Sequence, residues 1–103
     1  MTGGRIVGLV LVIGTAVASA QERFSLEQIR HGAQIYSQNC APCHGSRMLD
    51  PNSAFDLRKF PPSEKGRFVN SVVKGKNQMP PWGDLFKPED VDALWAYVMA
   101  GEK

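Results

Sequence analysis

The two cysteines of this 103-residue chain, Cys40 and Cys43, stand three positions apart and are followed at once by His44. Two thiols at this spacing can add to the two vinyl groups of one porphyrin, which fixes the ring to the chain. The residue after the second cysteine then lies under the ring, where its imidazole can ligate the iron. Cys-x-x-Cys-His is the attachment sequence for c-type haem. The spacing therefore predicts one covalently bound haem c, with His44 as an axial ligand of its iron.

Three other uses of the cysteine pair fit the sequence less well. A thioredoxin-type dithiol needs a strand that leads into the pair within a βαβ unit, but the flanking residues follow a helical pattern. A structural zinc site needs four ligands, and only His31 would join the two cysteines and His44, at an unusual spacing. A disulfide across two intervening residues would close a very small loop and add little stability. Haem attachment is therefore the favoured interpretation.

A methionine is expected to supply the second axial ligand. Met79 stands in a loop stiffened by two prolines, far enough along the chain to wrap over the other face of the ring. Met48 lies four residues beyond His44 and cannot readily reach that face. Met99 falls in a helical stretch, where packing is the simpler role, and packing is also the alternative for Met79. His31 is the competing ligand, although a solvent-facing position on the first helix suits it better.

Ligation by His44 and Met79 would leave the iron without an open position. A thioether opposite an imidazole also raises the reduction potential of the iron. The chemistry that remains is electron transfer, not reaction with a substrate. The alternatives are a haem enzyme or gas sensor in which Met79 is displaceable, and a fixed cytochrome subunit of a larger oxidoreductase complex.

The first residues have the pattern of a secretory signal peptide. Arg5 precedes the apolar stretch Ile6–Val17, and the small residues Ala18–Ala20 follow as a cleavage site. The apolar stretch is shorter than the roughly 20 residues that a membrane-spanning helix requires. We therefore expect residues 1–20 to be cleaved off on export to the periplasm. Residues 21–103 would then form a single domain that does not span the membrane.

The mature domain is small and close to electrically neutral. A chain of this length buries little apolar surface, and a haem would supply a large apolar plate on which side chains can pack. Removal of Arg5 with the signal peptide leaves nearly equal numbers of basic and acidic residues. No basic stripe indicates a nucleic-acid partner. We expect a monomer whose partners are other redox proteins.

The apolar pattern predicts helices and no strand. The first helix covers residues 25–40 and opens with a capping box, in which a serine hydroxyl accepts from a first-turn amide. The second covers residues 64–74, with Ser63 as its N-cap and Gly75 as its closing glycine. The third covers residues 88–101 and opens with a proline, which the first helical position favours. The predicted fold class is all-α.

The order of these features resembles that of the class I c-type cytochromes over the whole mature chain. In that family the first and last helices cross closely, and a glycine and an aromatic residue meet a leucine and an aromatic residue. Gly32 and Tyr36 match the first pair. Leu94 and Tyr97 match the second, and Met79 with its following proline matches the family's sixth iron ligand. The resemblance implies the cytochrome c fold, about three helices packed around one covalently attached haem, and electron transport as the function.

The resemblance also bears on Gly32 and on the partners. A glycine inside a helix costs about 1 kcal/mol relative to alanine, so Gly32 is either merely tolerated or needed by a crossing helix, which we favour.

Residues 79–84 and 94–98 are similar to those of cytochromes that serve quinoprotein alcohol dehydrogenases, including methanol dehydrogenase. This likeness implies a dehydrogenase that uses pyrroloquinoline quinone (PQQ) as electron donor. An oxidase or another cytochrome would be the acceptor.

Further haem contacts follow from residue type alone. Trp82 either donates its indole N–H to a haem propionate or simply packs against the ring. Arg58 and Lys59 either neutralise propionates or lie exposed at the surface. The second ring nitrogen of His44 is expected to donate to a backbone carbonyl, which would fix its tautomer, and Pro51 is the candidate acceptor.

Overall fold

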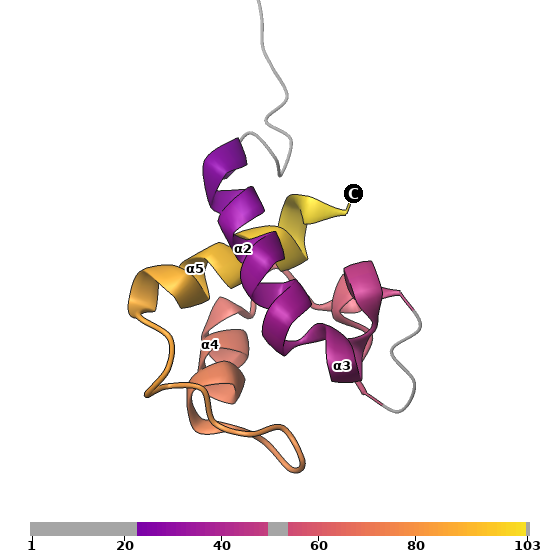
Figure 1. Ribbon diagram of the computed structural model, residues 1–103, viewed down its shortest axis with the longest axis vertical. Helices are drawn as coiled ribbons and strands as arrows, with labels where there is room; N and C mark the ends of the chain where they lie inside the picture. The colour runs from indigo at the N-terminus through magenta and orange to yellow at the C-terminus, as the bar shows by residue number, and fades with distance from the viewer. Residues whose placement is uncertain (1–22, 50–53, 103) are drawn as a thin grey trace, which may run out of the picture.

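The structure, a computed structural model, describes residues 23–49 and 54–102. The described residues form α2 (Leu26–Asn39), α3 (Ala41–His44), η1 (Ser46–Met48), η2 (Leu57–Lys59), α4 (Lys65–Lys74), α5 (Pro88–Ala96) and η3 (Tyr97–Gly101) (Figure 1). These described residues hold no strand, so the all-α prediction is confirmed. None of their helices is long and apolar enough to cross a membrane. The predicted signal peptide and its cleavage site lie outside the described residues.

Helix α2 begins at the predicted capping serine. The Ser25 side chain accepts a hydrogen bond from the Gln28 N–H at 3.0 Å, which satisfies an amide that has no partner inside the helix. Along α2 the residues Ile29, Gly32 and Tyr36 are buried. They recur at helical spacing, so one face of α2 is turned toward the rest of the molecule.

Helix α2 crosses α5 (Figure 1), and Gly32 lies where the two helices approach each other closely. A Cβ atom added to Gly32 would lie 2.9 Å from Tyr97 Cβ and would overlap the Ala93 carbonyl. The rings of Tyr36 and Tyr97 meet beside this point, with their centroids 5.1 Å apart. The prediction that Gly32 serves a helix crossing is therefore confirmed, because any larger residue would push α5 away.

Helix α4 starts one residue later than a Ser63 cap would require. Its N-cap is Glu64, whose side chain accepts no hydrogen bond from a first-turn backbone N–H. The Glu64 N–H donates to the Pro61 carbonyl at 3.1 Å, so the turn made by the preceding prolines extends as far as Glu64. The Ser63 prediction is therefore wrong. The other end is as predicted, because Gly75 closes α4 with φ of 80°, a backbone conformation that favours glycine.

Helix α5 opens with Pro88, as predicted, and its first turn is capped from within. The Asp90 carboxylate accepts from the Lys87 N–H at 2.9 Å. The last turns continue as the π-helical segment η3 and end at Gly101, the predicted last residue. Tyr97, the first residue of η3, lies against Tyr36 of α2.

The core lies at the crossing of α2 with α5 and continues toward α4. Phe60 contacts Trp95 and Phe68 edge to face, with ring centroids 5.8 Å and 5.6 Å away. Edge-to-face contacts of this kind are favourable for aromatic rings. The buried core side chains include Ile29, Ile35, Tyr36, Phe60, Phe68, Val72, Val91, Leu94, Trp95 and Val98.

Candidate functional site

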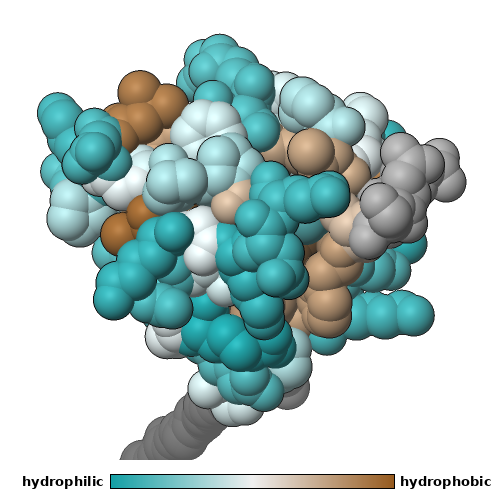
Figure 2. Space-filling model, turned by 90° about the horizontal axis from the view of Figure 1, so that it is seen from below, coloured by the Kyte–Doolittle hydropathy of each residue, from teal (hydrophilic) through white to brown (hydrophobic). Residues whose placement is uncertain are grey.

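A cavity of about 790 Å³ lies beneath the helix crossing. This volume falls within the roughly 300–1,000 Å³ of sites that hold cofactors and small ligands. On the end of the molecule seen in Figure 2, hydrophobic side chains show between hydrophilic ones. The residues that line the cavity come from every helix from α2 to α5 and include Tyr36, Cys40, Cys43, His44, Phe55, Leu57, Phe60, Arg67, Phe68, Ser71, Val72, Lys76, Met79, Trp82, Leu94 and Val98.

The two cysteines line the cavity from the α2–α3 junction. Cys40 ends α2, with its N–H donating to the Tyr36 carbonyl at 2.8 Å, and Cys43 lies one turn later in α3. Neither thiol is in a disulfide; Cys40 is half-buried and Cys43 is exposed. Burial, with the neighbouring Cys43 second, raises the pKa of the Cys40 thiol to about 11. Both sulfur atoms are therefore available to one ligand in the cavity.

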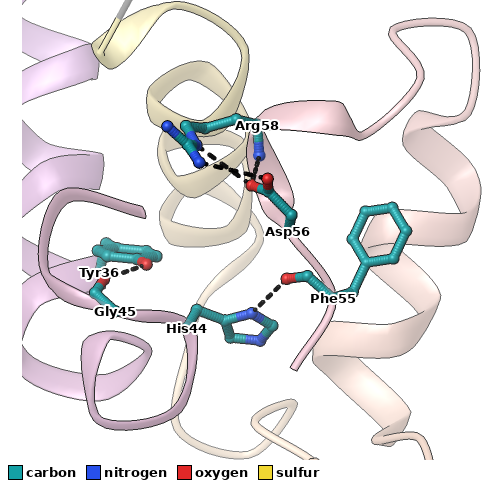
Figure 3. Close-up of polar contacts among 6 residues, drawn as sticks. All are labelled: Tyr36, His44, Gly45, Phe55, Asp56 and Arg58. Atoms are coloured by element: carbon teal, nitrogen blue, oxygen red, sulfur yellow. Dashed lines mark hydrogen bonds and ion pairs between the residues drawn. The ribbon is translucent and has the colours of Figure 1, made fainter. Parts of the chain in front are cut away.

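His44 is held by a backbone carbonyl, as predicted, but not by the one named from the sequence. Its Nδ1 lies 3.0 Å from the Phe55 carbonyl oxygen (Figure 3). Pro51, the predicted acceptor, lies outside the described residues. A carbonyl oxygen can only accept, so Nδ1 carries the proton and Nε2 keeps its lone pair for a metal.

The segment that carries the Phe55 carbonyl is fixed by an ion pair. The Asp56 carboxylate accepts from the Arg58 N–H at 3.1 Å and from its guanidinium at 3.2 and 3.3 Å. In Figure 3 the Arg58 side chain turns toward Asp56 and away from His44. The hydrogen bond from Arg58 is the main cause of a lowered pKa for Asp56. The turn around Phe55 is therefore held in place next to the imidazole.

The end of α3 is held by Tyr36. The Tyr36 hydroxyl donates to the Gly45 carbonyl at 2.6 Å, and burial raises the pKa of Tyr36 to about 12, so the hydroxyl keeps its proton. In the next turn the Arg47 guanidinium donates to Glu102 at 3.1 and 3.2 Å. The Tyr97 hydroxyl donates to the same carboxylate at 2.7 Å. These contacts tie the chain after His44 to the C-terminal segment.

Met79 lines the cavity from a loop that is bound back onto α4. The Lys76 N–H donates to the Met79 carbonyl at 3.0 Å, and the Met79 N–H donates to the Lys76 carbonyl at 2.9 Å. The Trp82 N–H donates to the Val72 carbonyl at 2.8 Å. The loop also passes so close to Gly75 that a Cβ atom there would lie 2.7 Å from the Met79 carbonyl oxygen. The half-buried Met79 side chain is therefore held at the cavity.

The other candidate ligands lie elsewhere. Met48 is fully buried and Met99 is 6% exposed, both within the core, and neither lines the cavity. The His31 ring contacts Asp90 at 2.9 Å across the α2–α5 pair, with half of its side chain exposed. Of the sulfur and imidazole groups weighed from the sequence, those at the cavity are Cys40, Cys43, His44 and Met79.

Trp82 lines the cavity, whereas Arg58 and Lys59 do not. The Trp82 ring stacks on Phe86, with centroids 5.4 Å apart. The basic side chains that line the cavity are instead Arg67 and Lys76, which the sequence analysis missed. Local sequence gives no signal for Arg67, because its place at the cavity depends on Phe60, a residue of a different segment.

The arrangement fits a haem. The cavity is walled by apolar and aromatic side chains, carries the two thiols and His44 at one wall, and brings Met79 from another element. Along 23–49 and 54–102, no three His, Cys, Asp or Glu side chains group as a metal site, and no strand leads into the cysteines. The zinc and thioredoxin interpretations therefore lack the surroundings that they need.

Comparison with known proteins agrees with this assignment. Residues 27–98 match the family described as cytochrome C oxidase, cbb3-type, subunit III. The chain is 34% identical over 79 residues to quinohemoprotein alcohol dehydrogenase ADH IIB of Pseudomonas putida, covering 74% of this chain and 11% of that protein. Cytochrome c6 of Microcystis aeruginosa is 36% identical over 74 residues, covering 67% of this chain and 91% of that protein.

A second cytochrome c6, from Nostoc sp., is 34% identical over 74 residues, covering 67% of this chain and 67% of that protein. The chain spans about a tenth of the length of the quinohemoprotein alcohol dehydrogenases that it matches. No solved structure matches significantly. The family match and the cytochrome c6 relatives show that the chain belongs to the c-type cytochromes of class I, haem-based electron-transfer proteins with one covalently bound, iron-containing haem c.

Proposed function

We propose that Cys40 and Cys43 bind the haem through thioether bonds and that His44 and Met79 are its axial ligands. The observation that carries this proposal is that all four side chains line one cavity. The hydrogen bond from His44 Nδ1 to the Phe55 carbonyl leaves Nε2 as the ligating atom and orients the imidazole ring. Trp82, which lines the same cavity, would contact the edge of the ring.

In this proposal the chain is an electron carrier and not an enzyme. The haem supplies a one-electron couple between ferric and ferrous iron. The role of the residues is to hold that couple rigidly. The paired hydrogen bonds with Lys76 and the close approach to Gly75 fix the Met79 backbone, and the Phe55 carbonyl fixes the His44 ring. With His44 and Met79 both bound to the iron, no open site would remain for substrate or oxygen.

The electron is proposed to pass in the periplasm between two protein partners. The matched segments of quinohemoprotein alcohol dehydrogenases favour a PQQ-dependent alcohol dehydrogenase as donor. The family description favours an oxidase as acceptor, with another cytochrome as the alternative. Residues 1–20 would direct export and be removed, leaving residues 21–103 as the haem-bearing domain. The mass of the protein purified from the periplasm would test this, since it equals residues 21–103 plus one haem only if cleavage follows Ala20.

A fixed cytochrome subunit is the second candidate function. Two observations favour it: the description of the family, and the relatives in which the matching segment is a small part of a longer enzyme. Size-exclusion chromatography of a native extract separates the two cases. A free carrier elutes as a small haem protein, whereas a subunit elutes with a larger oxidoreductase.

The proposed ligands are tested by the visible spectrum of the haem-matured protein, oxidised and reduced, with and without carbon monoxide. Ligation by His44 and Met79 gives a weak ferric methionine–iron band at the red edge, and the reduced protein does not bind the gas. Met79→Ala should abolish that band and open the iron to carbon monoxide, whereas the buried control Met99→Leu should keep it. Rapid gas binding by the unmutated protein would instead establish a labile site, as in an enzyme or sensor.

A further inference from the structure

The charged side chains that line the cavity are all basic. Among the described residues that line it, the basic groups beyond His44 are Arg67 and Lys76, and none is an Asp or Glu. A haem presents an apolar body and two propionate carboxylates. Buried or half-buried carboxylates require a cationic or hydrogen-bonding partner. The propionates of a haem in this cavity would therefore turn toward these two cations.

Arg67 is the better placed of the two to hold a carboxylate. Its guanidinium lies over the ring of Phe60, with Cζ 4.5 Å from the centroid, and Phe60 is itself buried at the cavity wall. Its Nε donates at 2.6 Å to the carboxylate of Glu64, the N-cap of α4. Because Phe60 contacts one face of the guanidinium and Glu64 binds its Nε edge, the orientation of the guanidinium plane is fixed.

The rest of the guanidinium is available to a ligand. Within the described residues Arg67 makes no other hydrogen bond through its side chain, so its two terminal nitrogens can face a carboxylate together. Such paired donation from arginine is stronger and more directional than contact with a lysine ammonium. Lys76 is exposed. Its pair of hydrogen bonds with Met79 fixes its backbone and not its side chain.

We propose that Arg67, oriented by Phe60 and Glu64, binds a haem propionate and thereby raises the reduction potential of the iron. This inference rests on the proposed haem site. Ferric iron carries one more positive charge than ferrous iron, so an uncompensated propionate stabilises the ferric state by Coulomb attraction. A cation paired with that propionate weakens this attraction. The ferric state is then less stabilised, and the reduction potential rises. Arg58, the arginine considered from the sequence, is occupied by Asp56 instead.

The test measures the midpoint potential of the haem-matured protein by spectroscopic redox titration. Arg67→Met should lower the midpoint, because it removes the charge and keeps an apolar side chain over Phe60. Arg67→Lys, which keeps the charge, should lower the midpoint much less. The matched control is Lys65→Met, which removes a cation from the same helix at an exposed pair with Asp92; its midpoint should stay near that of the unmutated protein.

Equal midpoints for Arg67→Met and Lys65→Met would overturn the proposal, as would a fall seen with Lys76→Met and not with Arg67→Met. If Arg67→Met does not mature, Glu64→Gln decides. Loss of the Glu64 charge leaves the guanidinium less neutralised, so the midpoint should rise; an unchanged or lower midpoint would overturn the proposal. Failure of the proposed haem site is distinguishable, because the unmutated protein would then lack the covalent haem spectrum altogether.

Discussion

The Nδ1 atom of His44 lies 3.0 Å from the carbonyl oxygen of Phe55, a residue 11 positions further along the chain. This contact sets which imidazole nitrogen carries the proton, and it depends on a backbone group, not on the Phe55 side chain. The carbonyl is aimed by the turn that Asp56 and Arg58 brace. The orientation of the proposed axial ligand is thus decided by a surface ion pair that does not itself line the cavity.

Loosening that turn should be visible at the imidazole. Asp56→Ala removes the acceptor for the Arg58 N–H and guanidinium, so the Phe55 carbonyl loses its fixed position. We expect the His44 Nδ1 proton of the haem-bound protein to exchange with solvent several-fold faster by NMR. Lys59→Ala, in the same turn but outside the cavity, is the control. An exchange rate that Asp56→Ala leaves unaltered would show that the ion pair does not hold the carbonyl.

The helix crossing predicts opposite effects of the same substitution at two glycines. Gly32→Ala places a Cβ atom against the Ala93 carbonyl and 2.9 Å from Tyr97 Cβ, and should cost roughly 3 kcal/mol, the upper end of overpacking penalties. Gly66→Ala meets nothing within 4 Å and should stabilise by about 0.5 kcal/mol through helix propensity and chain entropy. Denaturant unfolding of the two haem-bound variants measures both. Similar free energies of unfolding for Gly32→Ala and Gly66→Ala would mean that α2 and α5 separate easily.

Gly75 should matter to the iron as well as to stability. Alanine there would adopt φ of 80° and ψ of 165°, a region essentially limited to glycine, at a cost of about 1–3 kcal/mol. Its Cβ atom would also lie 2.7 Å from the Met79 carbonyl oxygen. Gly75→Ala should therefore weaken the methionine–iron bond, and the red ferric band should fade at a lower temperature than in Gly66→Ala. Retention of the band up to global unfolding would contradict the role given to this glycine.

The parts of the fold that were predictable are those written in local sequence. Residues 25–28 specify a capping box, and glycine and proline mark where helices close and open; the structure has α2, α4 and α5 at these places. Met79 could be separated from Met48 because chain length limits which face of the ring Met48 can reach, and from Met99 because Met99 falls in a helical stretch, where packing is the simpler role. The structure agrees in placing only Met79 of these three at the cavity.

The parts that were missed depend on groups that local sequence does not distinguish. Every residue has a carbonyl, so nothing in the sequence separates Phe55 from Pro51 as the partner of His44. The Ser63 cap failed because the turn of the preceding prolines runs on to Glu64. Arg67 resembles any charged residue on an exposed helix face until Phe60, from a different segment, is found beneath it.

The contact between His31 and Asp90 should make stability depend on acid pH in a defined direction. The hydrogen bond with His31, then that from the Lys87 N–H, lowers the pKa of Asp90 in the folded protein. Its stabilising effect is therefore complete above the unfolded pKa of about 3.9 and is lost as the pH falls through the lower, folded value. Because both side chains are partly exposed, the effect should stay within about 1 kcal/mol.

Asp90→Asn tests this sign, with Asp92→Asn as the matched control from the exposed pair with Lys65. Melting temperatures of the haem-bound proteins would be followed from neutral pH to about pH 3, below the unfolded carboxylate pKa. The deficit of Asp90→Asn should be constant at neutral pH and should shrink below about pH 4, where the unmutated carboxylate also loses its charge. A deficit that persists unchanged in acid would contradict this sign, because it could not come from the charge of Asp90, which the unmutated protein then also lacks.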